Sequence, residues 1–176
     1  MPLLPGFRSV TFVVIALALA SCQTVTPKPS ANRASFKANY MVARTALEGG
    51  QFSKAARGYA NLLKSSGPLQ PRIRLGYAHA LLRAGKYDKA SEEARIASTQ
   101  MEGRGRSAAL AVQATADQEI ARAAINRGNA SADAIQRLVA ARAAFDELLK
   151  KHPDMDPLGA LALRRKTIDV ELSTIR

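Results

Sequence analysis

Few residues of this 176-residue chain are of a type that performs covalent or acid–base chemistry. The chain has one cysteine, Cys22, and two histidines, His79 and His152. A nucleophilic thiol or a histidine base needs a second polar group at a defined spacing, and a metal site needs several converging ligands. The sequence contains no Gly-x-Ser-x-Gly, no His-Glu-x-x-His and no phosphate-binding loop. We therefore expect no catalytic residue, no metal site and no cofactor.

Cys22 follows a segment that favours export. Arg8 precedes an apolar run of about 11 residues over 10–20, which is shorter than the ~20 residues that span a bilayer and fits the core of a secretory signal. The run ends in Leu-Ala-Ser-Cys at 19–22, which resembles the lipoprotein box of bacteria. The resemblance implies cleavage before Cys22 and acylation of that residue, and Gln23 in the next position favours the outer membrane. The alternative is a cysteine that follows an ordinary signal by chance.

The next residues indicate a tether before the folded domain. Residues 22–34 are polar, contain Pro27 and Pro29 and show no apolar period, which is typical of a flexible linker. We expect a signal peptide over 1–21, a lipidated flexible tether over 22–34 and one helical domain over 35–176. Such a domain is long enough to bury a core, and without a second cysteine it must be stabilised by packing.

Apolar stripes with helical spacing predict seven helices and no strand. The first stripe comprises Phe36, Tyr40, Ala43 and Leu47, and the last comprises Leu158, Leu161, Leu163, Ile168 and Leu172. Ser131 is predicted to cap the sixth helix, and Asp156-Pro157 to begin the seventh. The predicted helices cover about 35–48, 52–64, 70–84, from 87 to a glycine break at 103–105, 107–127, 132–151 and 157–173.

A short pattern occurs twice at the junctions between helices. Gly50-Gln51-Phe52-Ser53-Lys54-Ala55 returns 35 residues later as Gly85-Lys86-Tyr87-Asp88-Lys89-Ala90. With a small residue before each turn, Ala43 and Ala78, the pattern resembles the tetratricopeptide (TPR) repeat, a helix-turn-helix unit of 34 residues. The resemblance implies an all-α, TPR-like α-solenoid of three helical hairpins plus a C-terminal capping helix. The repeats cover about 36–69, 71–104 and a degenerate 107–153, and the capping helix about 157–173; the alternative is an unrelated helical bundle.

In TPR proteins the first helix of each hairpin lines a groove, so the resemblance also implies a binding surface. By spacing, this surface comprises Lys37, Tyr40, Arg44, Arg72, Leu75, His79, Arg83 and Lys86, with Thr115, Gln118, Arg122 and Asn126 as its continuation. The chain has a net charge of +12. Between residues 22 and 74 it has nine Lys or Arg and a single acidic residue, Glu48. Such a surface should attract an acidic or carboxylate-ended segment of another protein. The alternative is that these cations form the solvated face of a basic protein.

These features predict a non-enzymatic adaptor of the bacterial envelope, held by lipid on the periplasmic face of the outer membrane. A lipoprotein box followed by few TPR units resembles the lipoproteins of tight-adherence (Flp) pilus assembly and the pilotins of secretion systems. One alternative is the binding of an anionic polymer or lipid head group, and another is self-association through the last helix. Nucleic acid is not expected as a partner because aromatic residues that could stack on bases are scarce.

Overall fold

Seven α-helices and two short 3₁₀ segments make up the part of the chain that the computed structural model describes, residues 31–175. The α-helices are α1 (Ala31–Glu48), α2 (Phe52–Leu63), α3 (Gln70–Arg83), α4 (Tyr87–Gln100), α5 (Gly103–Asn126), α6 (Ala132–Lys151) and α7 (Ala160–Thr174). The 3₁₀ segments are η1 (Gly67–Leu69) and η2 (Pro153–Met155). No strand occurs within residues 31–175, so the all-α prediction is confirmed. The predicted signal peptide, Cys22 and the tether up to residue 30 lie outside the described residues.

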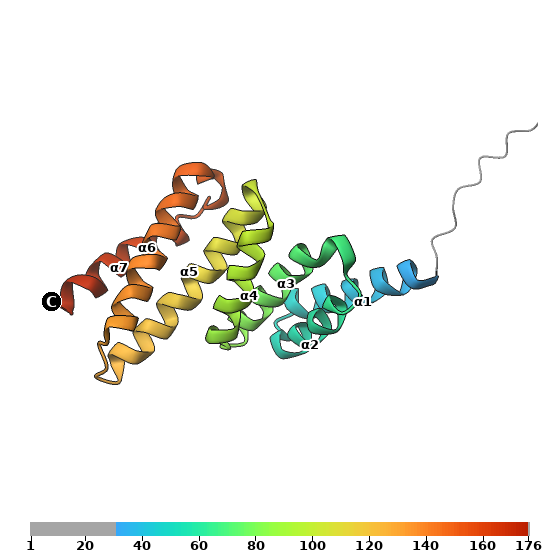
Figure 1. Cartoon of the computed structure of the whole chain (residues 1–176), viewed down its shortest axis with the longest axis horizontal. Coiled ribbons are helices and arrows are strands. Elements are labelled where there is room, and N and C mark those ends of the chain that lie inside the picture. Colours follow the sequence, from blue (N-terminus) through green and yellow to red (C-terminus); the bar gives the residue numbers. More distant parts are fainter. Residues whose placement is uncertain (1–30, 176) are drawn as a thin grey trace, which may run out of the picture.

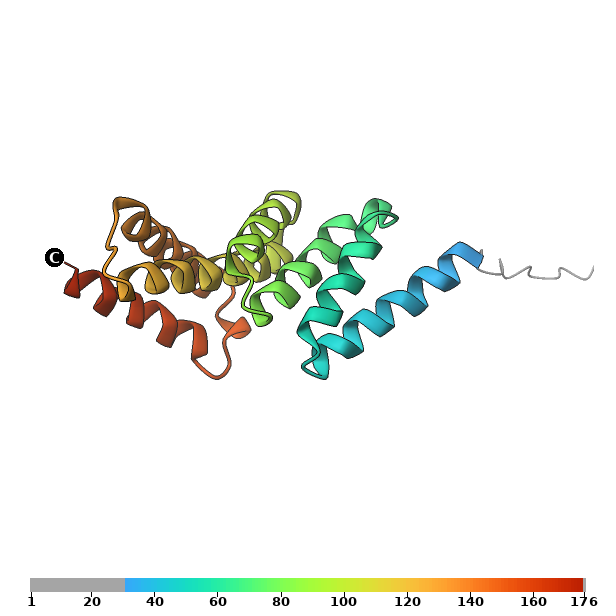
Figure 2. The same ribbon diagram turned by 90° about the horizontal axis from the view of Figure 1, so that it is seen from below.

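The helices follow one another along a rod, with α1 at one end and α7 at the other (Figure 1). A second view, from below, shows the same succession of hairpins (Figure 2). Each helix packs on the next one, and α5 also contacts α3 and α7. The odd-numbered helices therefore form one layer and the even-numbered helices the other, and we call their outer surfaces the odd-helix face and the even-helix face. This arrangement confirms the predicted solenoid of helical hairpins.

The same glycine turn closes each of the three hairpins. Gly50, Gly85 and Gly128 have φ values of 76°, 71° and 78°, in the left-handed region where glycine is favoured. In each turn the residue after the glycine donates its N–H to the carbonyl five residues before it, at 2.8, 2.9 and 3.0 Å. This is the hydrogen bond of a Schellman helix end, which satisfies a carbonyl that the helix leaves free. The glycine turn of the pattern seen twice in the sequence thus occurs three times in the fold.

Two further glycines allow neighbouring helices to cross closely. An ideal Cβ on Gly58 of α2 would lie 2.9 Å from Cβ of Ala43 on α1. An ideal Cβ on Gly76 of α3 would lie 2.7 Å from Cε1 of Tyr59 on α2. A larger residue at either position would have to push the helices apart, so these glycines set the spacing within the first hairpin and between it and the second.

The interior is divided into two hydrophobic clusters. The first joins α1, α2, α3 and α4 with Ala116 of α5 and includes Tyr59 and Ile73, and the second joins α5, α6 and α7 and includes Phe145 and Ile168. Between the clusters α4 packs on α5 through small residues. The buried residues of α4 are Ala90, Ser91, Ala94, Ala97 and Ser98.

Two helix boundaries differ from the prediction. α1 begins at Ala31, so residues 31–34 are helical rather than part of the tether. α5 begins at Gly103, so residues 103–105 form its first turn instead of a break, and the chain is extended at Met101 and Glu102. Gly105 lies in this first turn, where Met101 packs against it. A Cβ at position 105 would lie only 2.6 Å from Cε of Met101, so the absence of a side chain leaves room for the methionine.

The caps of the last two helices are predicted with different success. The hydroxyl of Ser131 accepts the N–H of Ala134 at 3.3 Å, which confirms it as the N-cap of α6. α7 begins only at Ala160, after a left-handed Gly159, so Pro157 is not its first residue. Asp156 nevertheless caps the helix from outside, because its two carboxylate oxygens accept the N–H groups of the second and third residues of α7 at 3.0 and 2.9 Å.

The apolar stripe predicted for the last helix is only partly buried. Ile168 is fully buried, and Leu161 and Leu172 pack against the same cluster. Leu158 and Leu163 are 93% and 65% exposed, so their assignment to the buried stripe is wrong. Leu158 lies in the connecting turn because the helix starts late. Leu163 lies two residues, or about 200°, after Leu161 and so faces the opposite side of the helix.

Candidate interaction surface

The predicted binding residues on the first two hairpins belong to the odd-numbered helices α1 and α3. Lys37 and Arg44 on α1 are exposed, as are Arg72 and Arg83 on α3. Leu75, between the two arginines of α3, is half-buried. The structure therefore presents four cations to solvent from neighbouring hairpins.

Tyr40 combines packing with the positioning of Arg44. Its ring meets that of Tyr59 edge to face, with centroids 6.2 Å apart and an interplanar angle of 73°. Nε of Arg44 donates to Oε1 of Glu48 at 2.7 Å. Hydrogen bonding first to Glu48 and then to Tyr40 raises the pKa of Arg44 above its usual value. The guanidinium of Arg44 is thus paired with Glu48 on the same helix, and more than half of its side chain remains exposed.

Arg83 and His79 lie one turn apart on α3 and behave differently. The guanidinium of Arg83 lies 4.6 Å from the centroid of the Phe52 ring, in a cation–π contact that ties α3 to α2. Partial withdrawal of the His79 imidazole from water, and then the charge of Arg83, lower the pKa of His79 below its usual value, although much of the residue remains exposed. The lowered pKa favours the neutral form of His79, and arginine and lysine supply the positive charge of this surface.

The predicted continuation of the surface along α5 is wrong. Gln118 is fully buried and Arg122 is half-buried, and both bond to Glu171 of α7, at 3.2 and 2.6 Å. Thr115 is half-buried and donates its hydroxyl to a carbonyl of its own helix, while Asn126 is exposed. α7 covers this part of α5, a contact between layers that spacing within one helix does not reveal.

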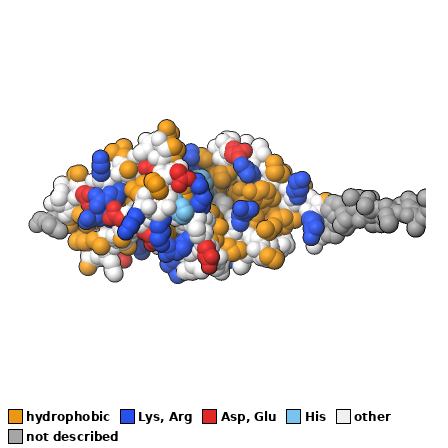
Figure 3. Space-filling view, turned by 90° about the horizontal axis from the view of Figure 1, so that it is seen from above, with side chains coloured by type: hydrophobic (Ala, Val, Ile, Leu, Met, Phe, Trp, Pro, Cys, Tyr) orange, Lys and Arg blue, Asp and Glu red, His pale blue; other side chains and the backbone are white. Residues whose placement is uncertain are grey.

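Charge is distributed unevenly along the rod. Residues 31–87 contain ten Lys or Arg and one acidic residue, Glu48, whereas residues 101–175 contain eleven and ten. In the latter stretch eight acidic side chains form ion pairs within the described chain. Among the described residues 31–87, only two basic side chains, Arg44 and Arg74, form ion pairs with a carboxylate. Figure 3 shows apolar surface flanked by Lys and Arg over the N-terminal half and mixed charges over the C-terminal half.

Two clefts on the even-helix face were not predicted from the sequence. The cationic cleft, about 400 Å³, lies between α2 and α4 with α3 as its floor. Its lining includes Arg57, Lys86 and Lys89, so the structure assigns Lys86 to this cleft rather than to the odd-helix face. The reason is the Gly85 turn, which sends the chain back before Lys86 and places this residue at the start of α4.

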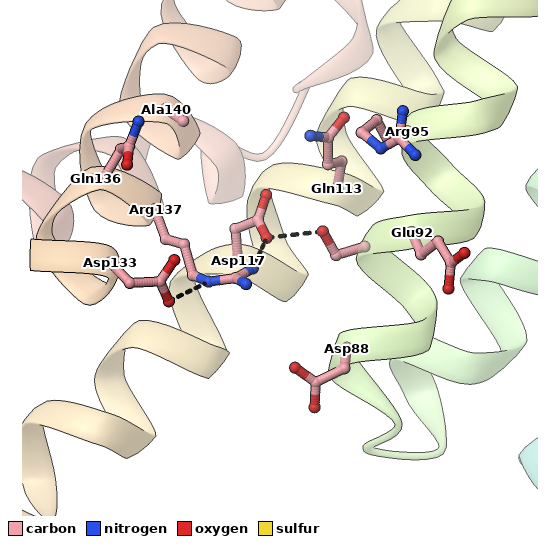
Figure 4. Close-up of a pocket in the computed structure, with 10 residues that line it drawn as sticks. Asp88, Glu92, Arg95, Gln113, Asp117, Asp133, Gln136, Arg137 and Ala140 are labelled. Atoms are coloured by element: carbon pink, nitrogen blue, oxygen red, sulfur yellow. Dashed lines mark hydrogen bonds and ion pairs between the residues drawn. The ribbon is translucent and has the colours of Figure 1, made fainter. Parts of the chain in front are cut away.

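The acidic cleft, about 420 Å³, lies between α4 and α6 with α5 as its floor (Figure 4). At its base Asp117 is only 5% exposed, and its Oδ1 accepts the hydroxyl of Ser91 at 2.7 Å and Nη1 of Arg137 at 3.0 Å. Nε of Arg137 also donates to Asp133 at 3.0 Å. The hydrogen bond to Asp133 is the largest cause that raises the pKa of Arg137, and Asp117 adds to it. This group of four side chains connects α4, α5 and α6.

No helix within residues 31–175 is both long and apolar enough to cross a membrane. In that same range no three His, Cys, Asp or Glu side chains come together as metal ligands would.

The fold and the exposed helix layers define a helical-hairpin solenoid, a class whose surfaces bind other molecules. The family model described as tetratricopeptide repeat matches residues 40–99. Residues 40–99, which lie within α1–α4, are thus similar to TPR repeats, and residues 100–176 lie beyond the match. TPR repeats generally mediate protein–protein interaction, so the binding of another protein is consistent with this fold. Searches of curated proteins and of solved structures gave no match.

Proposed function

We propose that this chain is a lipid-anchored adaptor of the bacterial envelope whose first two hairpins bind an acidic segment of another protein. The observation that carries the proposal is the surplus of free cations on the TPR repeats. Over residues 31–87 a single carboxylate accompanies ten basic side chains, and most of these are exposed. A field of this kind attracts an acidic partner from a distance and favours charge-assisted hydrogen bonds on contact.

The contrast with the C-terminal half supports a binding role for these cations. Arg142 and Arg165 on α6 and α7 bond to Asp169 and Asp146, and Arg122 and Arg164 bond to acidic side chains in the same way. There, basic residues stabilise helix contacts inside the molecule. Among the described residues of α1 and α3, only Arg44 and Arg74 pair with a carboxylate, so the other cations of these helices are available to a partner.

The second part of the proposal is the lipid anchor at Cys22. Eight residues separate Cys22 from the start of α1 at Ala31, and fully extended they reach at most about 30 Å. An acylated Cys22 would thus keep the basic hairpins next to the bilayer, and several acyl chains together hold a protein there stably. We place the anchor at the outer membrane, and the partner in a pilus or secretion assembly.

Reversing two charges on the odd-helix face tests the binding surface. Arg44→Glu with Arg83→Glu should abolish capture of the partner in cells, measured by crosslinking and mass spectrometry, without changing helicity. The matched control is Lys150→Glu with Lys166→Glu, which changes net charge equally but lies on α6 and α7, away from the first two hairpins. Capture that persists in the first pair, or is lost equally in both, would refute the assignment.

The same assay separates a protein partner from an anionic polymer or lipid head group, which the free cations would also attract. Binding to a polyanion should weaken steeply between low and physiological ionic strength, because exposed charges are screened over about 8–10 Å. A protein segment that also contacts half-buried Leu75 and Tyr40 should remain bound. For the anchor, Cys22→Ser should prevent acylation and signal cleavage by lipoprotein processing. Continued incorporation of labelled fatty acid would contradict the lipoprotein box.

A further inference from the structure

The cationic and acidic clefts occupy equivalent positions in successive repeats. Each lies between two even-numbered helices, with the odd-numbered helix between them in sequence as its floor. The α2 wall of the cationic cleft is formed by Ser53, Ala56, Arg57 and Ala60. Moved forward by the 35-residue repeat, these positions are Asp88, Ser91, Glu92 and Arg95, and all four line the acidic cleft. The two clefts are therefore the same structural site used twice.

The charge of this site is inverted between the two copies. Arg57 corresponds to Glu92, and uncharged Ser53 corresponds to Asp88. Three cations and no acidic residue line the cationic cleft. Four carboxylates and two guanidinium groups line the acidic cleft, and one of these, Arg137, is already bonded to two of the carboxylates.

The cationic cleft has an apolar floor as well as charge. Tyr77 and Leu81 of α3 form part of it and are 7% and 5% exposed. Nζ of Lys89 lies 5.6 Å from the centroid of the Tyr77 ring. Hydrogen bonding to Tyr77 is the largest cause that raises the pKa of Lys89. The cleft therefore combines a positioned ammonium group with a surface on which an apolar side chain can pack.

The acidic cleft offers an acceptor that the protein itself does not use. Both hydrogen bonds of Asp117 go to Oδ1, and no donor among residues 31–175 bonds to Oδ2. In Figure 4 this second oxygen points into the space between α4 and α6, and Asp88 extends toward the same space from α4. A carboxylate that is nine-tenths buried and has a free oxygen at the base of a cleft is suited to a Lys or Arg side chain from outside.

The distance between the clefts follows from the helix that separates them. α4 contributes to the walls of both clefts, and a helix with its side chains is about 10–12 Å across. An extended peptide advances about 3.3 Å per residue, so three to four residues span this distance. Two side chains of one segment can thus occupy both clefts at once.

We propose that the even-helix face binds an extended segment of a partner protein in which an acidic residue beside an apolar one is separated by three or four residues from a Lys or Arg. The acidic residue enters the cationic cleft and the basic residue the acidic cleft. This surface lies in the opposite layer from Arg44 and Arg83, so it is independent of the function proposed above. Charge complementarity at two repeat-equivalent clefts gives it specificity for a dipolar segment rather than for an acidic one.

A set of four peptides tests the proposal with the full-length chain purified in detergent. The probe is fluorescein-labelled Ser-Leu-Glu-Ser-Pro-Ser-Lys-Ser, compared with peptides in which Glu, Lys or both are replaced by Gln. Fluorescence anisotropy should show that each neutral replacement weakens binding about fivefold, as expected for a partly exposed ion pair of about 1 kcal/mol. Equal affinity for all four peptides would overturn the proposal.

Two variants at the repeat-equivalent positions then assign each charge to its cleft. Arg57→Gln should remove the preference for Glu and keep that for Lys, and Glu92→Gln should do the reverse. The controls Lys64→Gln and Glu102→Gln, at exposed positions outside both clefts, should keep both preferences. Preferences that survive Arg57→Gln and Glu92→Gln, or that are lost instead in Arg44→Glu with Arg83→Glu, would show that the peptide does not bind the even-helix face.

Discussion

Replacing Asp117 by alanine should destabilise the protein far more than the same change at Asp133, although both carboxylates bond to Arg137. The Asp117 side chain is 8% exposed and that of Asp133 is 71% exposed. Asp117 also accepts the hydroxyl of Ser91, which is itself buried. Asp117→Ala therefore leaves a buried hydroxyl and a guanidinium nitrogen without their acceptor, whereas Asp133→Ala leaves groups that water can reach.

The size of the difference follows from these exposures. Breaking a buried ion pair costs about 3–5 kcal/mol, but Arg137 is 34% exposed and keeps Asp133, which reduces the expected loss for Asp117→Ala to about 2 kcal/mol. The exposed pair with Asp133 contributes only about 0–0.5 kcal/mol. Asp117→Asn keeps an acceptor oxygen in the same place and should fall between them, at about 1 kcal/mol.

Urea denaturation followed by far-UV circular dichroism measures these losses. With a slope of about 2 kcal/mol per M, Asp117→Ala should lower the midpoint by about 1 M and Asp133→Ala by no more than about 0.25 M. Equal shifts for the two alanine variants would refute the reasoning, because they would mean that burial does not decide the strength of these bonds. An Asp117→Asn midpoint as low as that of Asp117→Ala would show that charge rather than the hydrogen bonds stabilises the site.

Three further predictions concern packing and pH. Gly76→Ala should cost about 1–3 kcal/mol, since its Cβ would lie 2.7 Å from a ring carbon of the neighbouring tyrosine; an unchanged urea midpoint would contradict this close crossing. Phe145→Ala should lower the free energy of unfolding of the second cluster by about 3–5 kcal/mol. Because all four tyrosines belong to the first cluster, tyrosine fluorescence should then report a later transition than circular dichroism, and coincident transitions would contradict two separable cores. Hydrogen bonds from Lys151 and then Arg106 lower the pKa of Glu147 in the folded protein. The stability that this carboxylate gives the fold is therefore present above its unfolded pKa of about 4.5, and it is lost as the pH falls through the lower folded pKa. Glu147→Gln should flatten the decline of the midpoint from about pH 5 to pH 3, and an unaltered decline would exclude this carboxylate as its source.

Features encoded locally could be predicted from the sequence. The turns at Gly50 and Gly85 and the cap at Ser131 depend on residues within one helical turn, and the structure has them where the sequence places them. The predicted start of α7 at residue 157 is wrong because the chain first passes through a left-handed Gly159, and Asp156 caps the helix from the far side of this glycine. The Asp-Pro pair does not predict this geometry. Predictions thus succeed where the deciding contact is a few residues away along the chain.

Features that depend on contacts between layers could not be predicted in the same way. Gln118 has the spacing of a groove residue, but it is buried because Arg164 and Glu171 of α7 bond to it. Each of the two clefts combines residues from three helices. In the sequence, the only sign of them is that Arg57 and Glu92, one 35-residue repeat apart, have opposite charges. Whether a helical position faces solvent, a neighbouring layer or a cleft is decided by helices far away in the chain.

The small residues between α4 and α5 bring the two halves of the rod close together. Alanine and serine side chains let the two helix backbones approach, and Ala116 of α5 belongs to the first hydrophobic cluster, so the interior continues across this contact. The cationic cleft lies wholly on the α1–α4 side, while the acidic cleft spans the contact between α4 and α6. The Ser91–Asp117 hydrogen bond therefore ties the two halves together at the base of the acidic cleft.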